Sequence, residues 1–154
     1  AKDGIKVIGT GDVTDDEQVN GMGDPVLGMI TSMNYSADHD SPENKAFVSA
    51  FEKANPGMRP NFMAVGGYDG MALIYKALDK TKGDTDGTKL VDAMKGMAWT
   101  SPRGPISIDP ETRDIVQNVY IRKVEKKNGQ LYNVEFETVP NVKDPFKAAK
   151  AAGK

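Results

Sequence analysis

The sequence contains no cysteine and a single histidine, His39. Without cysteine there is no disulfide, no thiolate ligand for a metal and no cysteine nucleophile. A histidine-activated serine is not indicated either, because no Gly-x-Ser-x-Gly elbow accompanies His39. We therefore expect His39 to be a surface residue of a polar connector, and nothing in the sequence favours an enzyme.

The sequence also lacks an excess of positive charge and a long apolar run. Its formal net charge is −2, whereas a protein that binds nucleic acid needs a basic face to neutralise phosphates. No apolar run approaches the ~20 residues that cross a bilayer. The 154 residues, of which 38% are hydrophobic, suffice for one domain with a packed core. These features argue against a nucleic-acid partner and against disorder of the whole chain.

Strand and helix signals alternate over the first two thirds of the chain. The first predicted strand is a buried parallel strand that ends at Gly9. Residues 14–17 have the spacing of a capping box, which predicts a helix start at that point. Ser41 and Pro42 form a second helix start signal. The elements predicted in this part are strands at 5–8, 28–36 and 61–65, and helices at 42–54, 71–81 and 88–97.

The last part of the chain predicts an antiparallel hairpin. Residues 115–124 can lie extended, and apolar residues alternate with polar ones from Tyr132 to Phe136. Asn128 and Gly129 stand between these segments, and Asn-Gly is the strongest short hairpin signal. The predicted fold class is therefore α/β, ending in an antiparallel hairpin.

The turn Gly9-Thr10-Gly11 carries half of a dinucleotide-binding fingerprint. Thr14 replaces the third glycine of that fingerprint. Three carboxylates, those of Asp12, Asp15 and Asp16, would repel a pyrophosphate more strongly than one helix dipole attracts it. The turn therefore argues against a phosphate site, and a nucleotide-dependent α/β enzyme or regulatory domain is kept as the alternative.

Acidic residues also cluster in two other polar segments, residues 38–40 and 83–89. The second segment resembles a calcium-binding loop, but Lys82 and Ala93 stand where that loop requires carboxylates. We therefore expect solvated turn and cap residues in both segments, with no metal and no cofactor.

A candidate ligand site follows from the positions of polar residues beyond predicted strands. Open α/β sheets hold ligands at the carboxyl ends of parallel strands. Asp12 lies just beyond one such end, where a partly shielded carboxylate suits an ammonium group. Tyr35, Phe62 and Tyr68 could supply apolar walls with polar tips. Two alternatives stay open, namely Asp12 as an ordinary turn residue and Tyr68 as a core residue.

Four segments carry a resemblance to a known family when their order and spacing are taken together. They are MGDPVLG at 22–28, NYSADHDSPENKAFVSAF at 34–51, MAVGGYDGMALIYKAL at 63–78 and RGPISIDPETRD at 103–114, followed by the predicted hairpin. They resemble the leucine/isoleucine/valine-binding family of periplasmic (type I) solute-binding proteins of ABC transporters, over nearly the whole chain. The resemblance implies a two-lobe α/β architecture, of which this chain is an incomplete C-terminal part.

The resemblance divides the chain between both lobes. Residues 1–36 would belong to the second lobe, 37–113 to the first, 114–139 to a hairpin returning to the second, and 140–154 to a C-terminal tail. Neither lobe would be complete, so a large apolar surface should stay uncovered. We expect the missing N-terminal portion of the same protein, or an intertwined copy, to cover it.

The resemblance also implies a function, that of the extracytoplasmic solute-binding component of an ABC transporter. The ligand would be an amino acid, an amide or an aromatic acid, held in a cleft between the lobes. Asp12 falls on the family's ammonium-binding acid, and Tyr35, Phe62 and Tyr68 map near the cleft. Membrane transporter subunits are implied as partners, with a periplasmic or extracellular location and no catalysis. A non-transport sensor with the same fold is a further alternative.

Overall fold

The computed structural model describes residue 4 and residues 6–151 of the chain. Ile5, expected in the first strand, and residues 152–154 of the expected tail lie outside these residues. The described part is mixed α/β, with a six-stranded sheet in the order β1-β2-β5-β4-β3 and with β6 paired to β5. This confirms the predicted fold class. The strands are β1 (Ile8–Thr10), β2 (Ile30–Met33), β3 (Ala98–Ser101), β4 (Gly104–Ile108), β5 (Ile115–Lys127) and β6 (Gln130–Val142).

β1 is the strand that carries the glycine turn, and it pairs with β2 in parallel as predicted. The expectation that this strand is buried is wrong, because Ile8 is 75% exposed. β1 is the outer strand of the sheet, next to β2 alone in the described part of the chain. In the described residues, the edge of β1 opposite β2 therefore pairs with no other strand.

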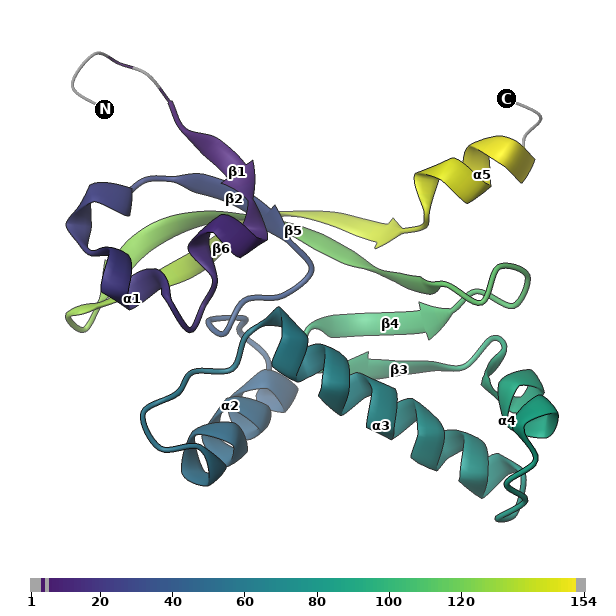
Figure 1. Ribbon diagram of the computed structural model, residues 1–154. Helices are drawn as coiled ribbons and strands as arrows, with labels where there is room; N and C mark the ends of the chain where they lie inside the picture. The colour runs from purple at the N-terminus through teal and green to yellow at the C-terminus, as the bar shows by residue number, and fades with distance from the viewer. Residues whose placement is uncertain (1–3, 5, 152–154) are drawn as a thin grey trace.

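The long strand β5 joins the two halves of the sheet (Figure 1). Residues 115–117 pair with β4, whereas residues 120–123 pair with β2. β6 follows β5 antiparallel, with shifts of register after Gln117 and Ile121. The turn between them falls at Asn128 and Gly129, which have positive φ angles of 51° and 82°, as a two-residue hairpin requires. The predicted hairpin is confirmed.

The helices flank the sheet and leave α5 extending away from it (Figure 1). They are α1 (Val19–Met22), α2 (Pro42–Ala54), α3 (Phe62–Lys80), α4 (Gly87–Met94) and α5 (Pro145–Ala151), with 3-10 turns η1 (Gly11–Thr14) and η2 (Asp24–Val26). α2 begins where predicted, because the Ser41 hydroxyl accepts a hydrogen bond from the Asn44 N–H. None of the described helices combines the length and the apolarity that a bilayer crossing requires.

The strand predicted at residues 61–65 is wrong, because α3 begins at Phe62. The Asn61 side chain accepts hydrogen bonds from the N–H groups of Met63 and Ala64, which is the arrangement of a helix N-cap. The glycines at 66, 67 and 70, which suggested a turn, lie inside this helix. Burial of Val65 on one face of α3 outweighs the low helix propensity of these glycines.

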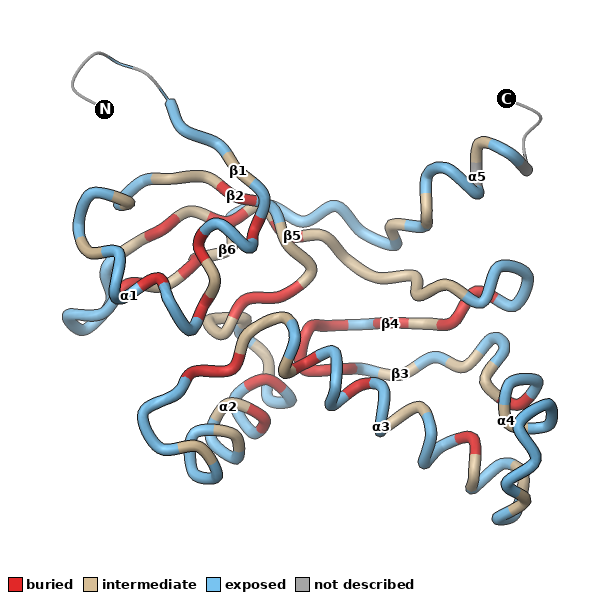
Figure 2. The backbone as a smooth tube through the Cα atoms, in the orientation of Figure 1, coloured by how far each residue is buried: buried red, intermediate tan, exposed pale blue. Residues whose placement is uncertain are grey.

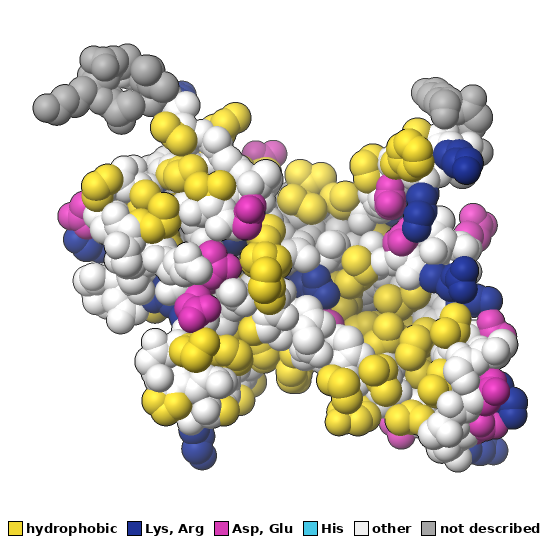
Figure 3. Space-filling view, in the orientation of Figure 1, with side chains coloured by type: hydrophobic (Ala, Val, Ile, Leu, Met, Phe, Trp, Pro, Cys, Tyr) yellow, Lys and Arg dark blue, Asp and Glu magenta, His cyan; other side chains and the backbone are white. Residues whose placement is uncertain are grey.

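The buried apolar side chains of the described residues include two small packed clusters. One contains Val19, Val124 and Leu131, and the other contains Tyr35, Phe47 and Val65. Figure 2 shows that long stretches outside them, including much of α3, are exposed. Figure 3 shows apolar side chains gathered over the face on which α3 lies. The large exposed apolar residues include Val7, Ile8, Met63, Tyr68, Met71, Ile74, Tyr75, Phe136, Val139 and Phe146, so the chain has the uncovered apolar surface that was expected.

Candidate functional site

The turn after β1 presents Asp12 to solvent. η1 follows β1 directly, and Asp12 is an exposed residue within it. A hydrogen bond from the Thr10 side chain, together with one from the backbone, lowers the pKa of Asp12 below its ordinary value. The carboxylate is therefore ionised at neutral pH and can accept hydrogen bonds from a ligand.

Gly11, which precedes Asp12, lies in close contact with two other elements. A Cβ atom built on Gly11 would stand 2.7 Å from Arg122 Nη2 and 2.7 Å from Met33 Cγ. Real Cβ atoms do not approach other atoms so closely. The glycine is thus required by the packing of β2 and β5 against the turn, which is a reason independent of any phosphate.

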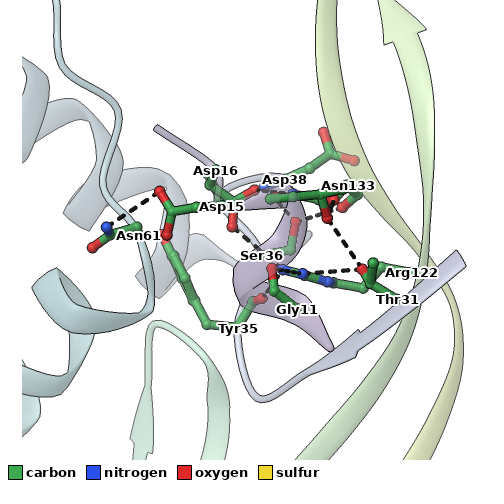
Figure 4. A network of polar contacts seen from close by, with 12 residues as sticks. Gly11, Asp15, Asp16, Thr31, Tyr35, Ser36, Asp38, Asn61, Arg122 and Asn133 are labelled. Carbon is green, nitrogen blue, oxygen red and sulfur yellow. Dashed lines mark hydrogen bonds and ion pairs between the residues drawn. The ribbon is translucent and has the colours of Figure 1, made fainter. Parts of the chain in front are cut away.

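Arg122 of β5 lies beneath this turn, and its side chain is only 1% exposed. Its Nη2 donates to the carbonyl of Gly11 at 3.0 Å and to Thr31 Oγ1 at 3.1 Å. Its Nη1 donates to the carbonyl of Tyr35 at 2.6 Å and lies 3.4 Å from Asp16 Oδ2. Figure 4 shows these groups converging on the guanidinium.

Asn133 of β6 holds the other side of the same network. Its Nδ2 donates to the carbonyl of Thr14 at 2.7 Å and to Asp16 Oδ1 at 2.9 Å. Its Oδ1 accepts from the Thr14 hydroxyl at 2.8 Å. The capping box predicted at residues 14–17 is therefore wrong, because Thr14 is buried and donates to Asn133, and the helix begins only at Val19.

The sequence did not reveal Arg122, Asp16 or Asn133 as parts of a common network. Charged residues are almost never fully buried unless they are paired, and the partners here are more than 100 residues apart in the chain. A period-two pattern in β5, in which Tyr120, Arg122 and Val124 are all buried, places Arg122 on the inward face of the strand. Val119 and Ile121, on the other face of β5, are apolar as well, so no alternation in the sequence marks Arg122 as a buried residue.

The buried carboxyl group of Asp16 has an unusual protonation equilibrium. Burial raises its pKa from 3.8 to about 6, while the charge of Arg122 and the hydrogen bond from Asn133 oppose this rise. Asp15 next to it adds a smaller repulsion. The folded protein therefore binds a proton at Asp16 more tightly than the unfolded chain does.

This raised pKa predicts a pH-dependent stability. A carboxyl whose pKa is higher in the folded state stabilises the fold below its unfolded pKa, and the contribution is lost as the pH rises through the folded pKa. The unfolding free energy of the unmutated protein, minus that of the Asp16→Asn variant, should fall by about 2 kcal/mol between about pH 4 and pH 7. Urea unfolding of both proteins at several pH values measures this difference, and a flat profile would contradict the prediction.

The three aromatic residues predicted near a cleft occupy different environments. Tyr35 is fully buried in the core, where its hydroxyl donates to Asn44 Oδ1 at 3.0 Å and its ring packs edge-on against Phe47. Phe62 packs against the same cluster. Tyr68 lies on α3 and is 53% exposed. Tyr35 is thus buried by packing and presents no surface to a ligand, whereas the side chain of Tyr68 is partly exposed.

His39 is not the surface residue that was expected. It is partly buried, its Nδ1 lies 2.8 Å from Glu135 Oε2, and its ring packs against that of Tyr120. His39 and Glu135 line a cavity of about 890 Å³ between α2 and the β5–β6 hairpin. Asp12 does not line this cavity. Among the described residues, no three His, Asp or Glu side chains gather into a metal-binding group.

α3 begins beside the Asp12 turn. Asn61, the residue that caps α3, donates from Nδ2 to Asp15 Oδ1 at 3.3 Å. Arg59, just before it, donates from Nη1 to the carbonyls of Asp16 and Leu131 at 3.3 and 2.7 Å. The helix that carries Tyr68 is therefore tied directly to the loop that carries Asp12.

Comparison with known proteins shows the same fold in solute-binding proteins. A family model described as periplasmic binding protein matches residues 1–130. Leu/Ile/Val-binding protein homolog 6 of Brucella abortus (strain 2308) is 46% identical over 145 residues, which cover 92% of this chain and 37% of the relative. The chain therefore spans little more than a third of that curated relative.

Two crystal structures from Rhodopseudomonas palustris are similar to this chain. A solute-binding protein of an ABC transporter from strain BisB5, in complex with 3,4-dihydroxybenzoic acid, is 64% identical with a TM-score of 0.91, covering 95% of this chain and 40% of that one. A second, from strain HaA2 in complex with p-hydroxybenzoic acid, is 43% identical with a TM-score of 0.89, covering 96% and 40%. This chain belongs to the family of periplasmic binding proteins that includes the solute-binding proteins of ABC transporters.

Proposed function

We propose that this chain is part of the extracytoplasmic solute-binding component of an ABC transporter and that Asp12 binds the ligand directly. The observation that carries the proposal is the exposed, ionised carboxylate at the end of β1. This is the end of a parallel strand, where open α/β sheets bind ligands. The location is periplasmic or extracellular, and the protein delivers its ligand to membrane subunits without catalysis.

The ligand class that best fits is a hydroxylated aromatic acid. The similar proteins from R. palustris were crystallised with dihydroxybenzoic and hydroxybenzoic acids. A ligand carboxylate would be repelled by Asp12, whereas a ring hydroxyl can donate a short, charge-assisted hydrogen bond to it. The exposed ring of Tyr68 offers a face for the aromatic ring. An amino acid, whose ammonium would contact Asp12, is the second candidate.

The groups that bind the ligand carboxylate come, in this proposal, from a portion of the receptor outside this chain. The exposed edge of β1 and the exposed apolar residues of α3 are surfaces that such a portion would cover. The change of partner along β5 supports a division into lobes at residues 1–36, 37–113, 114–139 and 140–154, because β5 pairs first with β4 and then with β2. Ligand bridging both lobes would favour the closed state.

The proposal is tested with a chimera in which this chain replaces the matching part of the R. palustris BisB5 protein. Calorimetry measures its affinity for 4-hydroxybenzoate, benzoate and leucine. Asp12→Asn should weaken 4-hydroxybenzoate binding about 10-fold or more, because a neutral amide is a weaker acceptor, and should leave benzoate nearly unaffected.

Asp40→Asn is the matched control, because Asp40 is an equally exposed carboxylate outside the proposed site. It should leave all three affinities unchanged. A chimera that binds none of the three compounds would refute the ligand class. Equal losses for 4-hydroxybenzoate and benzoate in Asp12→Asn would refute the role of Asp12.

A further inference from the structure

The Asp12 turn depends on one side chain that lies in a distant part of the sequence. We propose that Arg122 is a positioning residue of the ligand site, which fixes the Asp12 turn and links it to the connector between β2 and α2. The inference rests on the proposed function of Asp12. It assigns to Arg122 no contact with the ligand itself.

The first link runs from Arg122 to the turn. The carbonyl that accepts from Nη2 at 3.0 Å belongs to Gly11, the residue directly before Asp12. The same Nη2 is close enough to Gly11 to exclude a Cβ atom there. A displacement of the guanidinium therefore displaces the backbone of Asp12, because the Gly11 carbonyl belongs to the peptide bond that joins Gly11 to Asp12.

The second link runs from Arg122 to the connector. Its Nη1 donates to the carbonyl of Tyr35 at 2.6 Å, and Tyr35 is the second residue of the connector that runs from β2 to α2. Asn44 of α2 then donates from Nδ2 to the carbonyls of Ala37 and His39 at 3.1 and 2.9 Å. These hydrogen bonds, with the backbone between Tyr35 and His39, thus join the Asp12 turn, the connector and the first turn of α2 (Figure 4 shows the part around Arg122).

The chemistry of arginine explains why one residue can make both links. The guanidinium is a rigid planar fork that presents several donors in fixed directions, whereas a lysine ammonium is a single point charge. Asp16 supplies the countercharge at 3.4 Å, and Thr31 accepts a further bond. Nε has no hydrogen-bond partner within residues 4 and 6–151. All the bonds of the guanidinium therefore come from the Nη end, which faces the turn and the connector together.

A double-mutant cycle in the chimera tests whether Arg122 acts through Asp12. Arg122→Lys should weaken 4-hydroxybenzoate binding about 10-fold and change benzoate binding little. In the Asp12→Asn background the same substitution should have almost no further effect. Losses that add in the double variant, or that are equal for both ligands, would overturn the proposal.

Arg103→Lys is the matched control, because Arg103 is also a buried arginine paired with an aspartate, but in the β3–β4 part of the sheet. It should not discriminate between 4-hydroxybenzoate and benzoate. A control that discriminates as strongly as Arg122→Lys would show that general destabilisation is the cause.

Hydrogen exchange tests the positioning role without a ligand. Arg122→Lys should accelerate amide exchange in residues 10–15 and 36–41 together, while residues 104–108 keep their protection; Arg103→Lys should spare the first two segments. If the unmutated chimera binds no ligand, the proposed function fails. The exchange pattern would still show whether Arg122 fixes the Asp12 turn and the connector. Unchanged exchange in both segments would overturn the positioning role.

Discussion

Replacing Gly11 with alanine is expected to lower the free energy of unfolding by about 3 kcal/mol, because the new methyl group overpacks a closed site. It would stand 2.7 Å from Arg122 Nη2 and would collide with Met33. Neither neighbour can retreat easily, since Met33 lies in β2 and the Arg122 guanidinium holds the carbonyls of Gly11 and Tyr35. Urea unfolding of the purified variant measures the loss.

Gly21→Ala is the control for this prediction. Gly21 lies in α1, and a Cβ atom there meets nothing within 4 Å. Alanine in a helix is favoured over glycine, so this variant should be as stable as the unmutated protein or slightly more stable. Equal stabilities of the Gly11 and Gly21 variants would show that the turn is not closely packed.

Replacing Asp69 with asparagine is expected to lower the free energy of unfolding by about 3–5 kcal/mol, because it leaves a buried guanidinium without its countercharge. Asp69 of α3 accepts from Arg103 Nε at 2.7 Å and from the Ser101 hydroxyl at 2.9 Å through the same oxygen, Oδ2. The side chains of Asp69 and Arg103 are only 4% and 8% exposed. Chemical unfolding monitored by circular dichroism measures the effect.

Asp40→Asn also serves as a control for this second prediction. Asp40 pairs with Lys45 at 2.6 Å, but both side chains are largely exposed. Surface ion pairs contribute little to stability, so this variant should unfold almost as the unmutated protein does. If Asp69→Asn were equally harmless, water would have to reach Arg103 in the folded state.

The elements that were predicted correctly have strong local signals. Asn128 and Gly129 indicated the hairpin because this pair adopts the positive φ angles that the turn requires. Ser41 and Pro42 indicated the start of α2 for an equally local reason, a side-chain cap. Local chemistry determined both boundaries, so one sequence was sufficient to place them.

The incorrect predictions share a different cause. Residues 61–65 looked like a strand that ended in a glycine turn, yet the Asn61 cap and the burial of Val65 produce α3. Thr14 looked like a helix cap, yet its hydroxyl donates a hydrogen bond to Asn133 Oδ1. The Asn61 cap is a local contact that the glycines at 66, 67 and 70 obscured, whereas the burial of Val65 and the bond from Thr14 to Asn133 are tertiary. Periodicity carries no information about such tertiary contacts.

Sequence reasoning reached only the exposed part of the candidate site, and the ligand-binding role of Asp12 stays a prediction. Asp12 followed from the strand and turn that precede it, whereas Arg122 and Asp16 become recognisable only after β5 is placed beneath the turn. Tyr35 was assigned to the cleft by resemblance, but its hydroxyl and ring are used inside the core. Burial depends on which elements pack together, and that is not a local property.

The bonds that hold the Asp12 turn also determine when it can form. Arg122 is 111 residues later in the chain than Gly11, and Asn133 is 119 residues later than Thr14. During synthesis Asp12 is made before β5 and β6, the strands that shape its turn, and contacts between residues so distant in sequence form slowly. A product that terminates before β6 would contain Asp12 and Arg122 but would lack Asn133, so the Asp12 turn would miss the bonds that Asn133 makes to Thr14 and Asp16.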